Sequence, residues 1–491
     1  MGLGSAITGF WQHRWRKTDC SSDLRSGVLN GSLTSSGGGY FRVSLMKWEK
    51  FLRTFFERPR NFRGGFPPWG RLYEGRTEKL SAIWGGSPVK KLRACAPGPN
   101  YHGGPEIMFA GKSVAKLFCS FSTVAAFALL GFVPGTRLAA QSTGDVYVLS
   151  NESDENAVIV FHRNADGTIE RAGRFPTGGS GSGSGTDPLG SQGPVILSAD
   201  NRMLFAVNAG SDSISAFSVS GDELNLLQTV SSGGTRPISL TASHDLLYVL
   251  NSGDSANISG FRIVPGSSPL VRVEGSTQPL PGGSAAEPAE VLFNREGNVL
   301  LVTEKGTNQL DSFTVDEAGK ASMAEAYPST GPVPFGCAFG RGNVAITAYT
   351  ANAAPQAGGI GSYKVSDEGN LSAIGAEVSD NQTASTWLAV TGNGTIVFTT
   401  NTVSGTISSF AVSRESGNVT LSRPVAASLR SEESGSSFPS DMALSNDSRY
   451  LYVRNGANGT VSAFIVQVDG SLTRVAHAEG LPESAAGIAA R

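Results

Sequence analysis

Short apolar runs alternate with turn residues over the last two thirds of this chain. Each run is rich in Val, Ile, Leu, Phe and Tyr, and Gly, Asn and Asp separate one run from the next. Runs this short, bounded by turn residues, predict β-strands. About ten residues after many of these runs, an aromatic residue closes a second apolar run, so the pattern repeats as a unit.

Seven copies of this unit follow one another at intervals of 44 to 56 residues, measured between the closing aromatics. This interval is typical of four-stranded propeller blades. One such unit cannot bury its own apolar face, so we predict an all-β fold, a seven-bladed β-propeller. The copies are Val146–Val148 with Phe161, Leu204–Val207 with Phe217, Leu247–Leu250 with Phe261, Leu300–Thr303 with Phe313, Val344–Thr347 with Tyr363, Ile396–Phe398 with Phe410 and Leu451–Arg454 with Phe464.

The two ends of the repeat region are incomplete in complementary ways. The chain enters the first unit at Val146 without an inner strand before it. It finishes on Gly487, Ile488 and Ala489, an inner-strand run with no outer strands after it. We therefore predict that the terminal strands form one composite blade, which closes the ring and hides its edges.

The first 140 residues follow neither strand nor helix periodicity. From Met108, two lysines precede an apolar stretch over residues 117–133, and small residues end at Ala140. This order predicts a secretory signal peptide over 108–140 and a periplasmic or secreted propeller over 141–491.

Residues 1–107 contain 17 Lys and Arg against 7 Asp and Glu. Because a signal peptide normally begins a protein, we interpret 1–107 as upstream sequence translated in error. A disordered basic extension and a nucleic-acid-binding tail are the alternatives, and export disfavours the second.

Residues 141–491 contain 19 Lys and Arg against 34 Asp and Glu, a net charge of −15. Such a surface repels polyanions and anionic membranes, so we expect no nucleic-acid partner. The chain contains no run of 18 apolar residues, so we predict no membrane span.

The Gly/Ser run at 177–185 is not followed by a helix or a lysine, as a phosphate-binding loop would be. No His/Cys cluster has the spacing of metal ligands. We therefore expect no metal and no cofactor. We also expect the protein to be a monomer.

The chain resembles seven-bladed lactonase-like propellers in three features. These are the Leu-Tyr-Val-Asn motif of the repeats, the segment Leu189–Gly193 and the segment Val302–Lys305. That family includes 6-phosphogluconolactonases and carboxymuconate-cyclising enzymes, and the resemblance covers about 145–491. It implies hydrolysis of a lactone. In its enzymatic branches, His and Arg at the start of the inner strands, just after a proline, are thought to bind an anionic lactone.

This chain departs from that pattern. None of the equivalent positions is His or Arg, and two are acids, which would repel a carboxylate or phosphate group. We therefore expect any substrate to be a non-phosphorylated lactone. The equivalent positions are Pro194, Ser239, Glu290, Gly336, Trp387, Asp441 and Gly487.

Glu290 and Asp441 are the candidate catalytic residues, because two carboxyl groups with split pKa values can do acid–base work. They could also bind a cation or a sugar, or be solvated acids. The candidate ligand-binding residues at the channel mouth are Trp387, Glu304, Arg454 and Arg236.

Two functions stay open. One is an exported lactone hydrolase. The other is a non-catalytic binding or scaffold propeller, which takes a small molecule or an unknown protein at the channel mouth.

Overall fold

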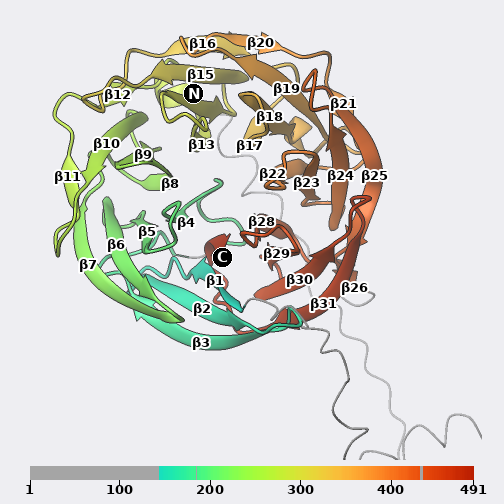
Figure 1. The fold of residues 1–491 in the computed structure, drawn as a ribbon, viewed down its shortest axis with the longest axis horizontal. Coiled ribbons are helices and arrows are strands. Elements are labelled where there is room, and N and C mark those ends of the chain that lie inside the picture. The colour runs from blue at the N-terminus through green and yellow to red at the C-terminus, as the bar shows by residue number, and fades with distance from the viewer. Residues whose placement is uncertain (1–142, 184, 432–434) are drawn as a thin grey trace, which may run out of the picture. The chain divides into compact units, whose positions relative to one another are not determined.

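The computed structural model describes residues 143–183, 185–431 and 435–491. Within them, seven antiparallel sheets surround a central channel, as the propeller prediction requires (Figure 1). The expectations for 1–107 and for the signal peptide at 108–140 lie outside the described residues. In the described part of the chain, no helix is long and apolar enough to cross a membrane.

Each blade runs from an innermost strand beside the channel to an outermost strand at the rim. In this order, blades one to three consist of β32 (Ala486–Ala490), β1 (Gly144–Leu149), β2 (Ala157–Arg163) and β3 (Ile169–Pro176); β4 (Val195–Leu197), β5 (Met203–Asn208), β6 (Ser213–Ser220) and β7 (Glu223–Ser231); and β8 (Pro237–Ser243), β9 (Leu246–Asn251), β10 (Asn257–Ile263) and β11 (Leu270–Arg272), with β12 (Gln278–Pro279) also paired to β10. Blades four and five consist of β13 (Pro288–Phe293), β14 (Val299–Glu304), β15 (Gln309–Thr314) and β16 (Glu325–Pro328); and β17 (Pro334–Phe339), β18 (Val344–Tyr349), β19 (Gly359–Val365) and β20 (Leu371–Ala373), with β21 (Val378–Ser379) also paired to β19. Blades six and seven consist of β22 (Ser385–Val390), β23 (Ile396–Asn401), β24 (Thr406–Val412) and β25 (Val419–Ser428); and β28 (Pro439–Leu444), β29 (Tyr450–Asn455), β30 (Thr460–Val466) and β31 (Leu472–Ala478). A hairpin of β26 (Arg430–Ser431) and β27 (Gly435–Ser436) and two 3-10 turns, Gly283–Ala285 and Ala351–Ala353, complete the elements.

The aromatic residues that revealed the repeat are core residues. All seven are at most 2% exposed, from Phe161 in blade one to Phe464 in blade seven. Each aromatic pairs with a residue near the start of the second strand of its own blade, such as Phe313 with Leu300. Burying one such ring stabilises the fold by about 2–3 kcal/mol, which explains why the aromatic recurs in every blade.

The predicted ring closure is confirmed. Strand β32 pairs with β1, with Tyr147 opposite Ala489 and Val148 opposite Ile488. In Figure 1 the C-terminal strand accordingly lies at the centre of the ring, inside β1. The first and last strands of the propeller thus share one blade.

The two faces of the ring differ in their loops. We call the face where the inner strands begin the entry face, and the face where short turns lead from the inner to the second strands the turn face. Six of the seven inner strands carry a register shift near their start, at the level where Glu290 and Asp441 lie. A β-bulge turns side chains out of the regular alternation, so it can direct these acids toward the axis.

Candidate functional site

A cavity of about 420 Å³ lies on the channel axis and reaches toward the turn face. Its walls come from the inner strands of blades one, two, three, four and seven, and include the apolar side chains of Leu240, Met442 and Ile488. Both candidate catalytic residues, Glu290 and Asp441, line it. The described residues that line it include no Lys, Arg or His, so the cavity presents acids, hydroxyls and amides to a ligand.

Glu290 lies on β13, directly after the register shift that follows Pro288. Its side chain is 4% exposed, and Oε2 accepts a hydrogen bond from the backbone N–H of Cys337 at 2.5 Å. Burial raises the pKa of Glu290 well above its ordinary value, and the negative charge of Asp441 raises it further. The Cys337 hydrogen bond opposes this shift without cancelling it. Burial therefore favours the protonated form of Glu290.

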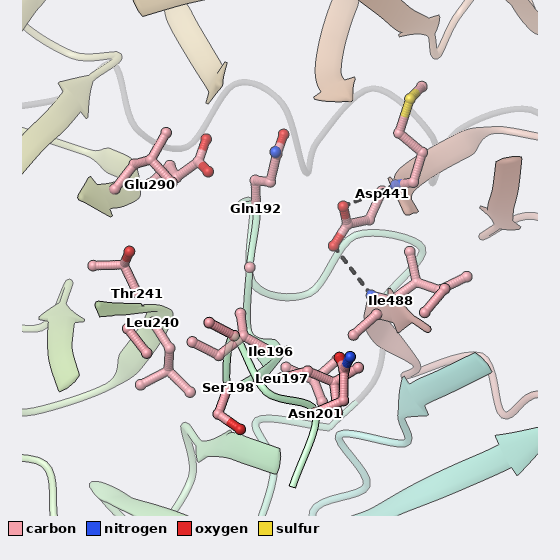
Figure 2. Close-up of a pocket in the computed structure, with 18 of the residues that line it drawn as sticks. Gln192, Ile196, Leu197, Ser198, Asn201, Leu240, Thr241, Glu290, Asp441 and Ile488 are labelled. Carbon is pink, nitrogen blue, oxygen red and sulfur yellow. Dashed lines mark hydrogen bonds between the residues drawn. The ribbon is translucent and has the colours of Figure 1, made fainter. Parts of the chain in front are cut away.

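Asp441 lies on β28 in the left-handed region, with φ of 60°, a strained conformation for an aspartate. Its two oxygens accept hydrogen bonds from the N–H groups of Met442 (2.8 Å) and Ile488 (3.2 Å) (Figure 2). Burial raises the pKa of Asp441 to about 7, while these two bonds and the positive charge of Arg454 limit the rise. Asp441 thus has two N–H donors and a nearby positive charge that favour its ionised form, whereas Glu290 has the single N–H donor of Cys337.

The two carboxyl groups approach the axis from different sides. Figure 2 shows Glu290 and Asp441 flanking Gln192, which projects between them. Two carboxyl groups whose environments separate their pKa values can act as a proton donor and a proton acceptor. We call Glu290 and Asp441 the acid pair.

Gln192 belongs to a stretch that the sequence did not reveal as part of the site. Residues Thr186–Gln192, which we call the crossing segment, pass over the channel at its entry-face end. The Gln192 amide donates to the carbonyl of Leu388 and accepts from its N–H, both at 3.0 Å. The backbone N–H of Gln192 also donates to Ala289 O at 3.1 Å. The crossing segment is thereby tied to blades four and six, and its last residue, Gln192, lines the entry-face end of the cavity.

Three cations hold the crossing segment from the entry face. Arg236 donates to the carbonyl of Pro188 (3.0 Å), Lys305 to that of Gly190 (2.7 Å), and Arg454 to that of Thr186 (3.2 Å). Arg236 is exposed, Lys305 is partly buried and Arg454 is only 1% exposed. Two of the four candidate ligand-binding residues, Arg236 and Arg454, thus bind the chain's own backbone.

Asp187 supplies a negative charge among these cations. Burial raises its pKa, while the charges of Arg454 and Lys305 oppose the shift. Burial also lowers the pKa of Lys305 to about 8, against the attraction of Asp187 and Glu287. The entry-face end of the channel therefore contains a compact cluster of opposite charges, separated from the cavity by Gln192.

The other two candidate ligand-binding residues lie outside the cavity. Trp387 is 1% exposed, packs edge-on against Phe335 with ring centres 4.9 Å apart, and donates from Nε1 to Ser191 O at 2.9 Å. Glu304 is fully buried at the end of β14 and accepts hydrogen bonds from Gly282 and Thr307. In this arrangement Trp387 contacts the crossing segment, and Glu304 contacts the loop that precedes β13.

The described residues contain no cluster of three or more His, Cys, Asp or Glu suited to a metal ion. The glycine-rich run before the crossing segment lies along blades one and two, where Gly181 and Gly183 donate to the carbonyls of Glu152 and Asn151.

Solved structures of several propellers superpose on this chain. A protein from Lactobacillus plantarum has a TM-score of 0.56 at 18% identity, over 71% of this chain and 99% of that one. A putative 6-phosphogluconolactonase from Bacteroides fragilis has a TM-score of 0.53 at 18% identity, over 72% and 99%. A periplasmic gluconolactonase from Pseudomonas aeruginosa has a TM-score of 0.54 at 16% identity, over 71% and 98%. At these identities the likeness establishes the fold alone.

No curated protein matches the chain in sequence. The family model described as "Lactonase, 7-bladed beta-propeller" matches residues 135–282 and 343–481, which is more than half of the chain. The match covers six of the seven aromatic residues that define the repeat. This chain therefore belongs to the family of seven-bladed lactonase β-propellers.

Proposed function

We propose that this protein is an exported hydrolase of a neutral lactone and that the acid pair is its catalytic centre. The observation that carries the proposal is the placing of two buried carboxyl groups, from blades four and seven, on one cavity. Membership of the lactonase propellers supports the reaction class. Export is supported by the signal-like sequence at 108–140 and by the periplasmic location stated for the Pseudomonas aeruginosa gluconolactonase.

The different surroundings of the two carboxyl groups assign the roles. Asp441, with a pKa of about 7, takes a proton from a water molecule as the water oxygen bonds to the lactone carbonyl carbon. Glu290, whose burial favours the protonated form, donates its proton to the ring oxygen as the carbon–oxygen bond of the ring breaks. The product is a hydroxy acid, and the two carboxyl groups have exchanged their protonation states.

The cavity favours a substrate without a charged group. The negative charge of Asp441 repels an anion, and the described residues of the lining supply no cation to balance it. Ser198, Asn201 and Thr241 line the cavity with hydroxyl and amide groups that suit the hydroxyls of a sugar lactone. The protein should therefore prefer a lactone such as gluconolactone over its 6-phosphorylated form.

Turnover of both lactones by the full chain tests the proposal. Glu290→Gln and Asp441→Asn should each lower kcat for the neutral lactone by about 10²–10⁴-fold, the usual contribution of a general acid or base. Glu368→Gln, which removes an exposed acid in blade five, is the control and should leave kcat unchanged. Fast hydrolysis of the phosphorylated lactone that neither substitution affects would contradict this site.

A non-catalytic binding propeller is the second candidate. Among the described residues, the crossing segment lies across the entry-face end of the channel, so the cavity is a pocket that opens toward the turn face. A pocket with one opening suits binding without turnover. Calorimetric binding of a neutral lactone without turnover, weakened by Glu290→Gln, would support this alternative.

A further inference from the structure

Blades two, six and seven each contain the same kind of side-chain hydrogen bond between their second and third strands. An asparagine at the end of the second strand donates to a serine placed diagonally across on the third strand. The pair is buried, and it joins the blade near the entry face. The bonds are Asn208 Nδ2 to Ser215 Oγ (2.8 Å) in blade two, Asn401 Nδ2 to Ser408 Oγ (2.7 Å) in blade six and Asn455 Nδ2 to Ser462 Oγ (2.9 Å) in blade seven.

Blade four has two acids at these positions. Glu304 ends β14 opposite Gln309, and Asp311 lies on β15 opposite Val302, which is the same diagonal. Both side chains are 0% exposed. The repeat therefore places two carboxyl groups where blades two, six and seven place an amide donor and a hydroxyl acceptor.

The hydrogen bonds of the two acids are unequal. Glu304 accepts one bond at each oxygen, from Gly282 N (3.1 Å) and from Thr307 Oγ1 (2.5 Å). Neither oxygen of Asp311 receives a hydrogen bond from a donor among the described residues. The carboxyl group placed diagonally across from it is that of Glu304, and two ionised carboxylates have no hydrogen to share.

We propose that Glu304 and Asp311 share one proton in the folded protein, which makes this carboxyl pair a pH-sensitive contact between blade four and the loop that leads into it. The shared proton replaces the amide hydrogen of blades two, six and seven, so Asp311 donates to Glu304. This proposal does not depend on lactone hydrolysis.

The described residues around the pair supply no compensating charge. Burial raises the pKa of Asp311 to about 9, and a hydrogen bond to Glu304 and the negative charge of Glu304 contribute to this rise. Lys305 is next along the chain, but its ammonium group bonds to the carbonyls of Gly190 and Pro288. Glu287, in the loop before β13, is exposed.

The adjoining outer strand adds no charge on this side of the sheet. Ala326 of β16 lies opposite Asp311. Its neighbours Glu325 and Tyr327 point to the other face and bond to each other at 2.7 Å.

The direction of the pH effect follows from the raised pKa. An aspartate of the unfolded chain loses its proton near pH 4, whereas Asp311 keeps it to about pH 9 when folded. Unfolding between these limits releases the proton, so the contribution of the pair to stability decreases as pH rises. Above about pH 9 the carboxylate of Asp311 repels that of Glu304, which weakens the hydrogen bond from Gly282 to Glu304.

Calorimetric unfolding in buffers of different ionisation enthalpy counts the protons released. The double variant Glu304→Asn/Asp311→Ser installs the pair of blades two, six and seven. At pH 7 it should release about one proton fewer on unfolding than the natural chain. Glu317→Gln, which removes an exposed acid of the same blade, should change nothing. Equal proton release from the natural chain and the double variant would overturn the proposal.

Asp311→Asn provides a second test if the double variant does not fold. Its amide gives Glu304 a permanent donor, so the melting temperature should fall less between pH 7 and pH 10 than in the natural chain. The carboxylic-acid C=O band of Asp311 should also be missing from its infrared spectrum at pH 7. An unchanged spectrum and an unchanged pH dependence would show that Asp311 is ionised.

Discussion

The central channel carries opposite chemistry on the two sides of Gln192. On the turn-face side of Gln192, the cavity presents the acid pair, and its described lining includes no cation. At the entry face, three cations bind the crossing segment through backbone carbonyls. Gln192 lies between the two regions. The comparison shows that a charged residue near the axis of a propeller can either line a cavity or bind a backbone segment that crosses the channel.

Electrostatics connects the two sides in spite of Gln192 between them. Arg454 is bound to the crossing segment, yet its positive charge lowers the pKa of Asp441 in the cavity. Asp187 has the opposite effect on Asp441. The charges of the entry face therefore help to set the protonation of the acid pair.

Deleting residues 484–491 should have the largest effect on stability, because it removes β32 and with it a wall of the cavity. The deletion takes away the buried side chain of Ile488, its N–H bond to Asp441, and the bond from Ser484 to Ser150 O. The free energy of unfolding should fall by about 3–6 kcal/mol. Urea unfolding of the full and shortened chains measures this, and equal midpoints would show that the ring does not depend on β32.

Arg454→Met should combine a stability loss with a change in the acid pair. The buried guanidinium loses its bond to Thr186 O, which should cost about 2–3 kcal/mol. Without its positive charge the pKa of Asp441 rises from about 7, so the base becomes ionised only at higher pH. The acidic limb of the pH profile of kcat/KM should therefore move to higher pH.

Arg454→Lys is the matched control, since it keeps the charge. Its acidic limb should stay near that of the natural chain. A limb that moves equally in the lysine and methionine variants would mean that Arg454 acts by packing and not by charge.

Gln192→Ala should weaken the division between the two regions. The substitution removes both side-chain hydrogen bonds to Leu388, so the free energy of unfolding should fall by about 1–2 kcal/mol. It also opens the entry-face end of the cavity toward Asp187 and its cations, and KM for the phosphorylated lactone should decrease relative to the neutral one. Unchanged selectivity would mean that Gln192 does not separate the two ends.

The architecture was predictable because its signal is repeated. Seven aromatics at regular intervals and the unpaired run at Gly487 indicated the blades and their closure, and the structure confirms both. The prolines that open the inner strands gave the right register for Glu290 and Asp441, since both line the cavity.

The crossing segment was not predictable in the same way. Its role depends on backbone carbonyls and on distant partners, such as the bond of Lys305 to Gly190, 115 residues apart. No periodicity encodes such contacts. The same holds for Asp311, whose environment becomes visible only when blade four is compared with the Asn–Ser pairs of blades two, six and seven.

Arg236→Gln should have the smallest effect and is the sharpest test of the separation between the two ends. Arg236 is exposed, and its single side-chain bond to Pro188 O lies in solvent, so its loss should change the free energy of unfolding by less than about 1 kcal/mol. Because Gln192 lies between the crossing segment and the acid pair, kcat and KM for a neutral lactone should stay within about twofold, a difference of less than about 0.5 kcal/mol. Steady-state turnover by the full chain measures both constants. A large rise in KM would place the substrate at the entry face, beside Arg236, and would move the candidate site away from Glu290 and Asp441.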